Sequence, residues 1–292
     1  MPIHLLPDLS STCLEPYRNL RTTNLTRFSG RFIAESKPLV RRLVDSGLPV
    51  ESFLVDRKYL DEAIAWLPSG AEIYVIDGEQ VSELIGFDFH RGFLACGIRP
   101  SYLAVDRVNL EKNLRPSVSI ESTLLPHEPT HSGIRSWMGV MLIGVQDPEN
   151  MGSILRSCAA LGVSDIFVGP ECVDPFARRV LRVSMGNAFK LHFYDARDPI
   201  DTLQVCHDLG IDTVAACLTD SSIELQKFQR IGPTLLILGN EAHGIPKPVQ
   251  DKAQRCIRID MEMGTDSLNV SVAGGIILHY LSRCSDRTRD SS

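Results

Sequence analysis

The sequence has no apolar run that could cross a membrane, because none approaches the roughly 18 residues that a spanning helix requires. Its first residues, MPIHLLPDLSS, lack the basic start and apolar core of a secretory signal peptide. Both absences predict a cytoplasmic protein with no membrane partner.

The sequence also lacks a metal-binding or disulfide framework. Its 8 cysteines are scattered, none forms a C-x-x-C pair, and none has a histidine at metal-ligand spacing. Several lie in apolar strings, such as Cys96 in FLACGI and Cys217 in VAACL, where a free cysteine behaves as a small hydrophobic residue. We therefore expect no metal, and buried or half-buried thiols.

The common nucleotide-binding patterns are missing as well. There is no G-x-G-x-x-G and no G-x-x-x-x-G-K-[ST], so the phosphate cradles of dinucleotide-binding and P-loop proteins are absent. No Ser-His-Asp arrangement is indicated either, which argues against a serine hydrolase.

Positive charge is not in excess, since the formal net charge is −6. This argues against a surface that binds a polyanion along its whole extent. Between Tyr17 and Arg42, however, seven basic residues face a single acid, Glu35, and they are Arg18, Arg21, Arg27, Arg31, Lys37, Arg41 and Arg42. This segment is either a solvated helix face or a local RNA-binding site.

The 292 residues are 43% hydrophobic and 23% charged, which is typical of a soluble globular protein with room for two domains. The first half predicts a helix that ends at Gly47, strands at 50–56, 71–77 and 92–98, and helices at 58–66 and 80–85. This alternation indicates a small α/β domain over residues 1–98. Residues 99–136 contain several Pro, Ser and Thr without a sustained period, and predict a linker, less clearly so at 102–113.

The second half alternates again between strands and helices. Strands are predicted at 137–145, 165–169, 190–195, 212–218 and 234–240, and helices near 151–162, 175–186, 199–209 and 268–283. This pattern predicts a parallel sheet covered on both faces, whose ligands bind at the carboxyl ends of the strands.

Three loops carry the chemistry. Two follow predicted strands and contain NMGSILRS (150–157) and LILGNEAHGI (236–245), and the third is IDMEMGTDSLNVSVAGGI (259–276). Each is ambiguous alone, since Ser267 and Asn269 could simply cap the last helix. Together, in this order and spacing, they resemble the three signature motifs of the SpoU (TrmH-like) RNA ribose 2′-O-methyltransferases, in the SPOUT superfamily.

The resemblance spans residues 138–283 and implies a SPOUT methyltransferase domain over 137–285, with a deep trefoil knot and a disordered tail at 286–292. The preceding FIAESKPLVRRLVDSGLPVESFLVD similarly resembles an L30e-like RNA-binding domain. By the motif match, the cofactor S-adenosylmethionine is expected to bind at Leu238, Gly239, Ile259, Met261 and Leu268. The implied catalytic residues are Asn150, Arg156, Glu241, Ser267 and Asn269.

The implied reaction moves a methyl group to a ribose 2′-hydroxyl of rRNA or tRNA. Family accounts favour Arg156 as the general base, but an arginine is almost always protonated, so it is either a base in a desolvated pocket or a cation that stabilises the developing alkoxide. Asn150 and Glu241 would orient it, and Ser267 and Asn269 would bind the ribose or its phosphate. The resemblance also implies a homodimer through the C-terminal domain, with this arginine reaching into the partner's site.

The sequence departs from the family pattern at Asp260, where many relatives have proline. This side chain would alter cofactor affinity if it pointed into the cofactor pocket, but we expect it to face solvent. The RNA itself is expected to contact Arg18, Arg21, Arg27, Arg31, Arg41 and Arg42, and also Arg178, Arg179, Arg182 and Lys190. Two other functions remain open: a non-catalytic RNA-binding protein that retained the fold, and a small-molecule methyltransferase or nucleotide-binding enzyme.

Overall fold

A computed structural model describes residues 2–6, 9–21, 29–87, 89, 92–114, 137–240, 242–263 and 267–283. Contacts divide the chain into two compact units. Unit 1 contains residues 1–101, 151–156 and 173–190, and unit 2 contains residues 102–150, 157–172 and 191–292. The domain boundaries that the sequence suggests stay a prediction, and most of the expected linker (115–136) and the expected tail (286–292) lie outside the described residues.

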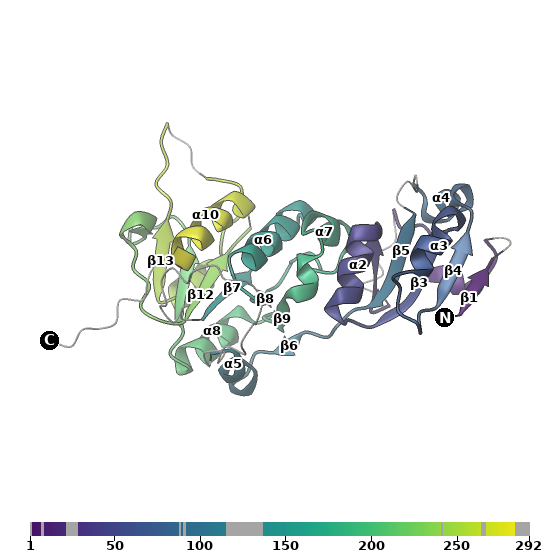
Figure 1. Ribbon diagram of the computed structural model, residues 1–292. Helices are drawn as coiled ribbons and strands as arrows, with labels where there is room; N and C mark the ends of the chain where they lie inside the picture. Colours follow the sequence, from purple (N-terminus) through teal and green to yellow (C-terminus); the bar gives the residue numbers. More distant parts are fainter. Residues whose placement is uncertain are drawn as a thin grey trace, which may run out of the picture. The chain divides into compact units, whose positions relative to one another are not determined.

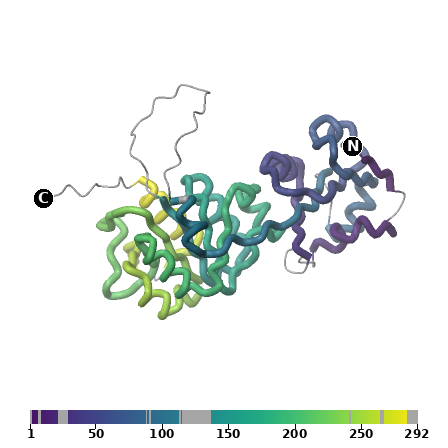
Figure 2. The backbone as a smooth tube through the Cα atoms, turned by 90° about the horizontal axis from the view of Figure 1, so that it is seen from below, coloured from purple at the N-terminus to yellow at the C-terminus, as the bar shows by residue number. Residues whose placement is uncertain are grey.

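Unit 1 contains a mixed five-stranded sheet in the order β1-β4-β3-β5-β2. The strands are β1 (Ile3–Leu5), β2 (Arg31–Glu35), β3 (Val50–Asp56), β4 (Ile73–Ile76) and β5 (Phe93–Ile98). β1, β4 and β3 are parallel, whereas β5 is antiparallel to both β3 and β2. The N-terminal strand pairs Ile3 with Ile73, so the start of the chain closes one edge of this sheet (Figure 2). The predicted small α/β domain is confirmed, although β1 is too short to be read from the sequence.

The helices of unit 1 are α2 (Lys37–Ser46), α3 (Leu60–Ile64), α4 (Gly78–Ile85) and α7 (Arg178–Val183), with short 3-10 turns at Thr12–Tyr17, Arg57–Tyr59 and Asn187–Lys190. Two helices of unit 1 end at a glycine in a left-handed conformation, Gly47 after α2 and Gly86 after α4. α2 buries Leu39, Val40 and Leu43, and ends at Gly47, whose φ of 73° is a left-handed conformation that glycine adopts without strain. The predicted stop at Gly47 is therefore confirmed.

Unit 2 contains an eight-stranded sheet in the order β11-β13-β10-β12-β7-β8-β9-β6, and every pairing is parallel. The strands are β6 (Leu103–Ala104), β7 (Met138–Leu142), β8 (Asp165–Val168), β9 (His192–Asp195), β10 (Asp212–Ala216), β11 (Ile223–Glu224), β12 (Thr234–Leu238) and β13 (Arg255–Arg258). The predicted parallel sheet is confirmed. Because all strands run the same way, their carboxyl ends form one edge, and those of β10, β12 and β13 are neighbours there.

Helices cover both faces of this sheet, as the sequence predicts: α10 (Val270–Arg283) lies on one face, and α5 (Arg107–Leu114) and α8 (Pro199–Asp208) lie on the other (Figure 1). The remaining helices are α6 (Pro148–Ala160), which runs through both units, and α9 (Lys247–Lys252). Alternate strand residues such as Met141, Phe167 and Ile237 form one core with Leu110 of α5 and Leu203 of α8. Burial of these side chains holds α5 and α8 against the sheet.

The segment 102–114 has more structure than the sequence indicates. β6 pairs with β9, and Leu110 of α5 is fully buried in the core of unit 2, with Val105 and Leu114 packed beside it. A helix of eight residues with so few apolar positions has too weak a period to be read from sequence. None of the helices in the described part of the chain combines the length and apolar character that a membrane span requires.

The seven cysteines in the described part of the chain are free thiols, either buried or half-buried, as expected. Burial raises the pKa of the Cys158 thiol on α6 to about 12. Thiols in this state are poor nucleophiles near neutral pH.

A buried carboxylate lies at the amino end of β8. Asp165 is 2% exposed and accepts hydrogen bonds from Trp137 Nε1 (3.0 Å) and Ser164 Oγ (3.0 Å), and His192 Nδ1 lies 3.3 Å from it. Burial opposes ionisation of Asp165, but hydrogen bonds from His192, Trp137 and Ser164 outweigh it and hold the pKa of the carboxyl below its ordinary value. The hydrogen bond to Asp165 in turn raises the pKa of His192.

This pair predicts a loss of stability as the pH rises. The folded-state pKa of His192 lies above the unfolded value of about 6.5, so its contribution is complete below that pH and is lost as the pH rises through the folded pKa. Because the His192 side chain is 53% exposed, we expect at most about 1 kcal/mol. Urea unfolding from about pH 5.5 to pH 8.5 should show this decline in the wild type but not in His192→Gln. Parallel pH profiles of the two proteins would contradict it.

Candidate active site

A cavity of about 390 Å³ lies at the carboxyl edge of the unit 2 sheet, where the segments after β10, β12 and β13 meet the start of α10. All five residues predicted to bind the cofactor line it, and they are Leu238, Gly239, Ile259, Met261 and Leu268. Ser267 lines the same cavity and is exposed. The volume falls within the range of about 300–1,000 Å³ that is usual for small-molecule sites. The structure therefore brings the second and third loops together around one pocket.

Gly239 is held where no side chain fits. A Cβ atom at this position would lie 2.5 Å from both the carbonyl carbon and the oxygen of Gly244, which are backbone atoms that cannot easily move. The close approach arises because Asn240 and Gly244 exchange two backbone hydrogen bonds of 3.1 and 2.9 Å. The turn after β12 is thus closed tightly over one wall of the cavity.

Asn240 fixes this turn to the neighbouring loop. Its Nδ2 donates to the carbonyl oxygen of Gly144, just after β7, at 2.7 Å, and its Oδ1 accepts from the amides of Ala242 and His243. No role for Asn240 was predicted from the sequence, because a glycine and an asparagine after a strand also form ordinary turns. Glu241, predicted to orient the arginine, lies outside the described residues.

The first and third loops are joined by a hydrogen bond between two of the predicted catalytic residues. Asn269 Nδ2 donates to Asn150 Oδ1 at 2.9 Å, across 119 residues of sequence. Asn150 is only 8% exposed, on the first turn of α6. Asn269 Oδ1 accepts from the backbone amide of Ser271 (2.9 Å) and from its hydroxyl (2.6 Å), so Asn269 caps α10. Asn269 therefore both caps α10 and contacts Asn150.

Because Asn269 has these two roles, we expect two substitutions at this position to affect stability and activity differently. Asn269→Ala should cost about 1 kcal/mol because the cap is lost. Asn269→Ser should keep most of the cap, because serine also accepts amide hydrogen bonds, but it is too short to restore the bond to Asn150. We expect the serine variant to be nearly as stable as wild type in urea unfolding, and as impaired as the alanine variant in methyl transfer. Full activity of Asn269→Ser would show that the contact with Asn150 is not needed.

Arg156 lies on α6, six residues beyond Asn150, and is exposed. It forms no hydrogen bond or ion pair with any other residue in the described part of the chain. Six residues along an α-helix give a rise of about 9 Å and leave two side chains about 120° apart around the axis. Arg156 and Asn150 therefore project from different sides of α6.

The structure adds residues that the sequence did not predict. Cys217 and Leu218 follow β10 and line the cavity, as do Gln250 and Arg258. The rule that ligands lie beyond the carboxyl ends of strands would have indicated Cys217 and Leu218, since β10 was predicted. Burial and the neighbouring Cys256 raise the pKa of Cys217, so it contributes a thiol rather than a thiolate. Asp260 is exposed, as expected, and accepts a hydrogen bond from Arg258 Nε at 3.1 Å.

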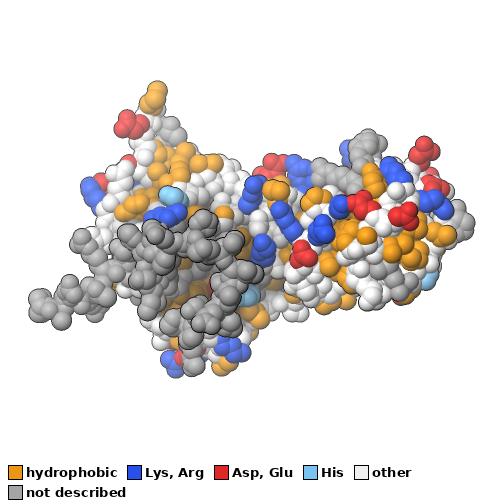
Figure 3. Space-filling model, viewed as in Figure 1, with side chains coloured by type: hydrophobic (Ala, Val, Ile, Leu, Met, Phe, Trp, Pro, Cys, Tyr) orange, Lys and Arg blue, Asp and Glu red, His pale blue; other side chains and the backbone are white. Residues whose placement is uncertain are grey.

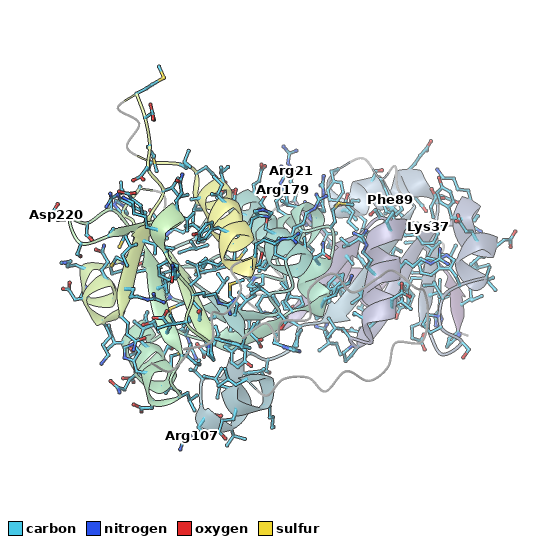
Figure 4. The ribbon with its side chains drawn as sticks, turned by 60° about the vertical axis from the view of Figure 1, so that its left-hand side comes forward. Arg21, Lys37, Phe89, Arg107, Arg179 and Asp220 are labelled. Carbon is cyan, nitrogen blue, oxygen red and sulfur yellow. The ribbon has the colours of Figure 1, made fainter. Side chains whose placement is uncertain are left out.

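Several residues of the predicted N-terminal RNA-binding segment have partners within unit 1. Arg18 donates to Glu15 at 2.8 Å, and Arg31 pairs with Glu51. Lys37, which lies at the start of α2 (Figure 4), donates a hydrogen bond to Glu62. Such pairing reduces the charge that these side chains offer to RNA.

The other members of this segment are more accessible. Arg21 is exposed, and Arg41 is exposed with its guanidinium 5.5 Å from the centre of the Trp66 ring. Arg42 donates a hydrogen bond to the carbonyl oxygen of Met185, which is a neutral group. Arg27 lies outside the described residues.

Known proteins share both the motifs and the fold. The sequence pattern of the SpoU rRNA Methylase family matches residues 138–279. An uncharacterised tRNA/rRNA methyltransferase of Mycobacterium tuberculosis is 30% identical over 281 residues, which cover 92% of this chain and 88% of that protein. The chain belongs to the SpoU rRNA methylase family. The family pattern matches only the half of the SpoU chain that holds the three loops, whereas the similarity to the Mycobacterium tuberculosis protein extends over both halves.

Two further relatives extend the comparison. The 23S rRNA (guanosine-2′-O-)-methyltransferase of Acinetobacter baylyi is 24% identical, over 74% of this SpoU chain and 80% of its own length. A crystal structure of an AdoMet-bound rRNA methyltransferase from Sinorhizobium meliloti superposes with a TM-score of 0.78 at 22% identity, covering 96% of this chain and 98% of that one. At that identity the likeness is one of fold, and it includes both units.

Proposed function

We propose that this protein transfers a methyl group from S-adenosylmethionine to a ribose 2′-hydroxyl in rRNA or tRNA. The observation that carries the proposal is the hydrogen bond between Asn150 and Asn269 beside the cavity that Ser267 and Leu268 line. It joins polar side chains from two remote loops of a SpoU family member at the carboxyl edge of a parallel sheet, where ligands of such sheets bind. The relatives named as RNA methyltransferases support the same reaction.

The cavity suits S-adenosylmethionine in its chemistry. Leu238, Ile259 and Leu268 offer apolar contacts, and the turn closed at Gly239 offers backbone polar groups at close range. When bound there, the cofactor supplies an electrophilic methyl group on a sulfonium. The protein's own task is then to align the ribose oxygen with that methyl group and to assist the loss of the hydroxyl proton.

The described side chains divide this work. Ser267 is exposed at the cavity, where its hydroxyl would bind the ribose or an adjacent phosphate. Asn269 has less capacity, because its Oδ1 caps α10 and one Nδ2 hydrogen is given to Asn150. We therefore assign Asn269 chiefly to positioning, and Arg156 to the reacting hydroxyl, either as its base or as a cation beside the alkoxide. Glu241 is proposed to orient Arg156.

The proposal includes a homodimer formed through unit 2. The exposed side of α10 begins with two apolar side chains, Val272 (50% exposed) and Ile276 (42% exposed), one helical turn apart. The different directions of Arg156 and Asn150 on α6 fit an arginine that serves the partner's site rather than its own. Light scattering should report a dimer for the wild type and a monomer for Ile276→Glu. Val108→Glu on α5, at an apolar position that is 64% exposed, is the control and should remain dimeric.

The direct test is incorporation of labelled methyl from S-adenosylmethionine into total RNA. Label in 2′-O-methylribose would establish the reaction, and mapping the labelled nucleotide would name the target. Cofactor binding without label on any RNA would favour a non-catalytic RNA-binding protein. Methyl transfer only to small molecules would favour a small-molecule methyltransferase. Absence of cofactor binding would end the methyltransferase proposal. The trefoil knot and the cytoplasmic location that the sequence implies also stay predictions.

A further inference from the structure

The segment after β10 forms part of the cavity wall and contains none of the predicted site residues. Cys217 and Leu218 line the cavity, and the Leu218 side chain is 59% exposed, so its packing in unit 2 does not hold it in place. Hydrophobic side chains also gather around the start of α10, which lines the same cavity (Figure 3). Since small-molecule pockets are lined mainly by apolar side chains, Leu218 is placed to contact a bound molecule.

Ser222 closes this segment into a turn. It is 5% exposed, and its Oγ donates to the carbonyl oxygen of Cys217 at 2.7 Å and accepts from the backbone amide of Thr219 at 3.0 Å. The backbone amide of Ser222 in turn donates to the carbonyl oxygen of Thr219 at 3.0 Å. Asp220 lies on the exposed outer side of the turn (Figure 4). The backbone of Leu218 is therefore fixed between Cys217 and Thr219, although its side chain is exposed.

Arg258 links this turn to the third loop. Its Nη1 donates to the carbonyl oxygen of Ser222, its Nη2 donates to Glu224 at 3.3 Å, and its Nε donates to Asp260 at 3.1 Å. Among the described residues that line the cavity, Arg258 has the one charged side chain, and the two carboxylates more than balance its charge. It therefore joins segments of the cavity wall instead of offering a free charge to an anion. A proline at position 260, as in many relatives, would leave Nε without this acceptor.

We infer that Ser222 and Arg258 are positioning residues that hold Leu218 against the bound cofactor. Leu218 makes the contact, whereas Ser222 and Arg258 act through it by fixing the turn before binding. A wall that is already ordered loses less conformational entropy on binding, so fixing the turn raises the affinity. The inference rests on the proposed function for the identity of the ligand as S-adenosylmethionine.

The test is calorimetric titration of the full chain with S-adenosylmethionine. We expect Leu218→Ala to lower the affinity about 10-fold, because an apolar contact is lost. Arg258→Gln and Ser222→Ala should each lower it about 3- to 10-fold, because the turn is released. In a Leu218→Ala background, either of these two substitutions should add less than about twofold, since both act through Leu218.

Arg255→Gln is the matched control for Arg258→Gln. Arg255 lies on the same strand, β13, and donates to Asp212 at 3.1 Å and to the carbonyl oxygen of Gln229 at 3.0 Å, but it does not line the cavity. Its replacement should lower the Tm, because two hydrogen bonds are lost, and should keep the affinity within about twofold of wild type.

Additive losses in the double variants would overturn the inference, because Arg258 and Ser222 would then act independently of Leu218. Wild-type affinity in every variant would also overturn it, as would an equal loss of affinity in Arg255→Gln and Arg258→Gln. Methyl transfer to total RNA is measured in parallel. Coupled losses of affinity without transfer to any RNA would support the inference and refute the proposed function, whereas transfer with additive or absent losses would do the reverse. A wild type that binds no S-adenosylmethionine would end both.

Discussion

Replacing Arg156 with alanine is expected to lower the rate of methyl transfer by about 100- to 10,000-fold, the range for loss of a proton-transfer or charge-stabilising group. Affinity for S-adenosylmethionine should stay within about twofold of wild type, because Arg156 does not line the cofactor cavity. Stability should change by less than about 0.5 kcal/mol, since the side chain is exposed and unpaired in the described part of the chain. Single-turnover rates, calorimetry and urea unfolding measure the three quantities separately.

Arg156→Lys distinguishes the two roles of this residue. If the guanidine acts as a base, lysine should keep some activity with a pH–rate profile shifted to lower pH, because its pKa of about 10.4 lies below that of arginine. If Arg156 acts as a fixed cation, activity should fall without any shift of the profile. Arg107→Ala on α5 controls for the loss of one positive charge. Normal transfer by Arg156→Ala would remove Arg156 from the mechanism.

The second large effect is expected at Gly239. In Gly239→Ala the new Cβ would meet the carbonyl group of Gly244 at 2.5 Å, and the turn that closes the cavity would have to open. Overpacking of this kind costs about 1–3 kcal/mol, which corresponds to a loss of about 10- to 100-fold in cofactor affinity if the turn forms the binding site. Calorimetric titration with S-adenosylmethionine measures the affinity, and thermal unfolding measures the accompanying fall in Tm.

Gly70→Ala is the matched control for this substitution. Gly70 lies in an exposed turn of unit 1 where an added Cβ meets nothing within 4 Å, so both stability and cofactor affinity should be preserved. If Gly239→Ala folds with reduced Tm but binds S-adenosylmethionine as wild type does, the cofactor does not occupy this cavity.

The sequence by itself determined the succession of elements and the residue types at the site. Strands with short apolar runs and helices with a 3.6-residue period were readable because burial against a sheet imposes that spacing locally. Cap and stop signals such as Gly47 were readable for the same reason, since they act within one helical turn. The site residues of the three loops could be named in advance, and six of them, the five predicted cofactor-binding residues and Ser267, line one cavity.

The tertiary structure alone decided which of these residues meet. β7 lies next to β12, nearly a hundred residues later in the chain, and this pairing brings Gly144 to Asn240. The contact of Asn150 with Asn269 follows likewise from how remote segments pack. The local sequence pattern indicates which face of each segment is buried, but it does not indicate the distances between segments. Those distances are set when the hydrophobic faces of sheet and helices are buried together.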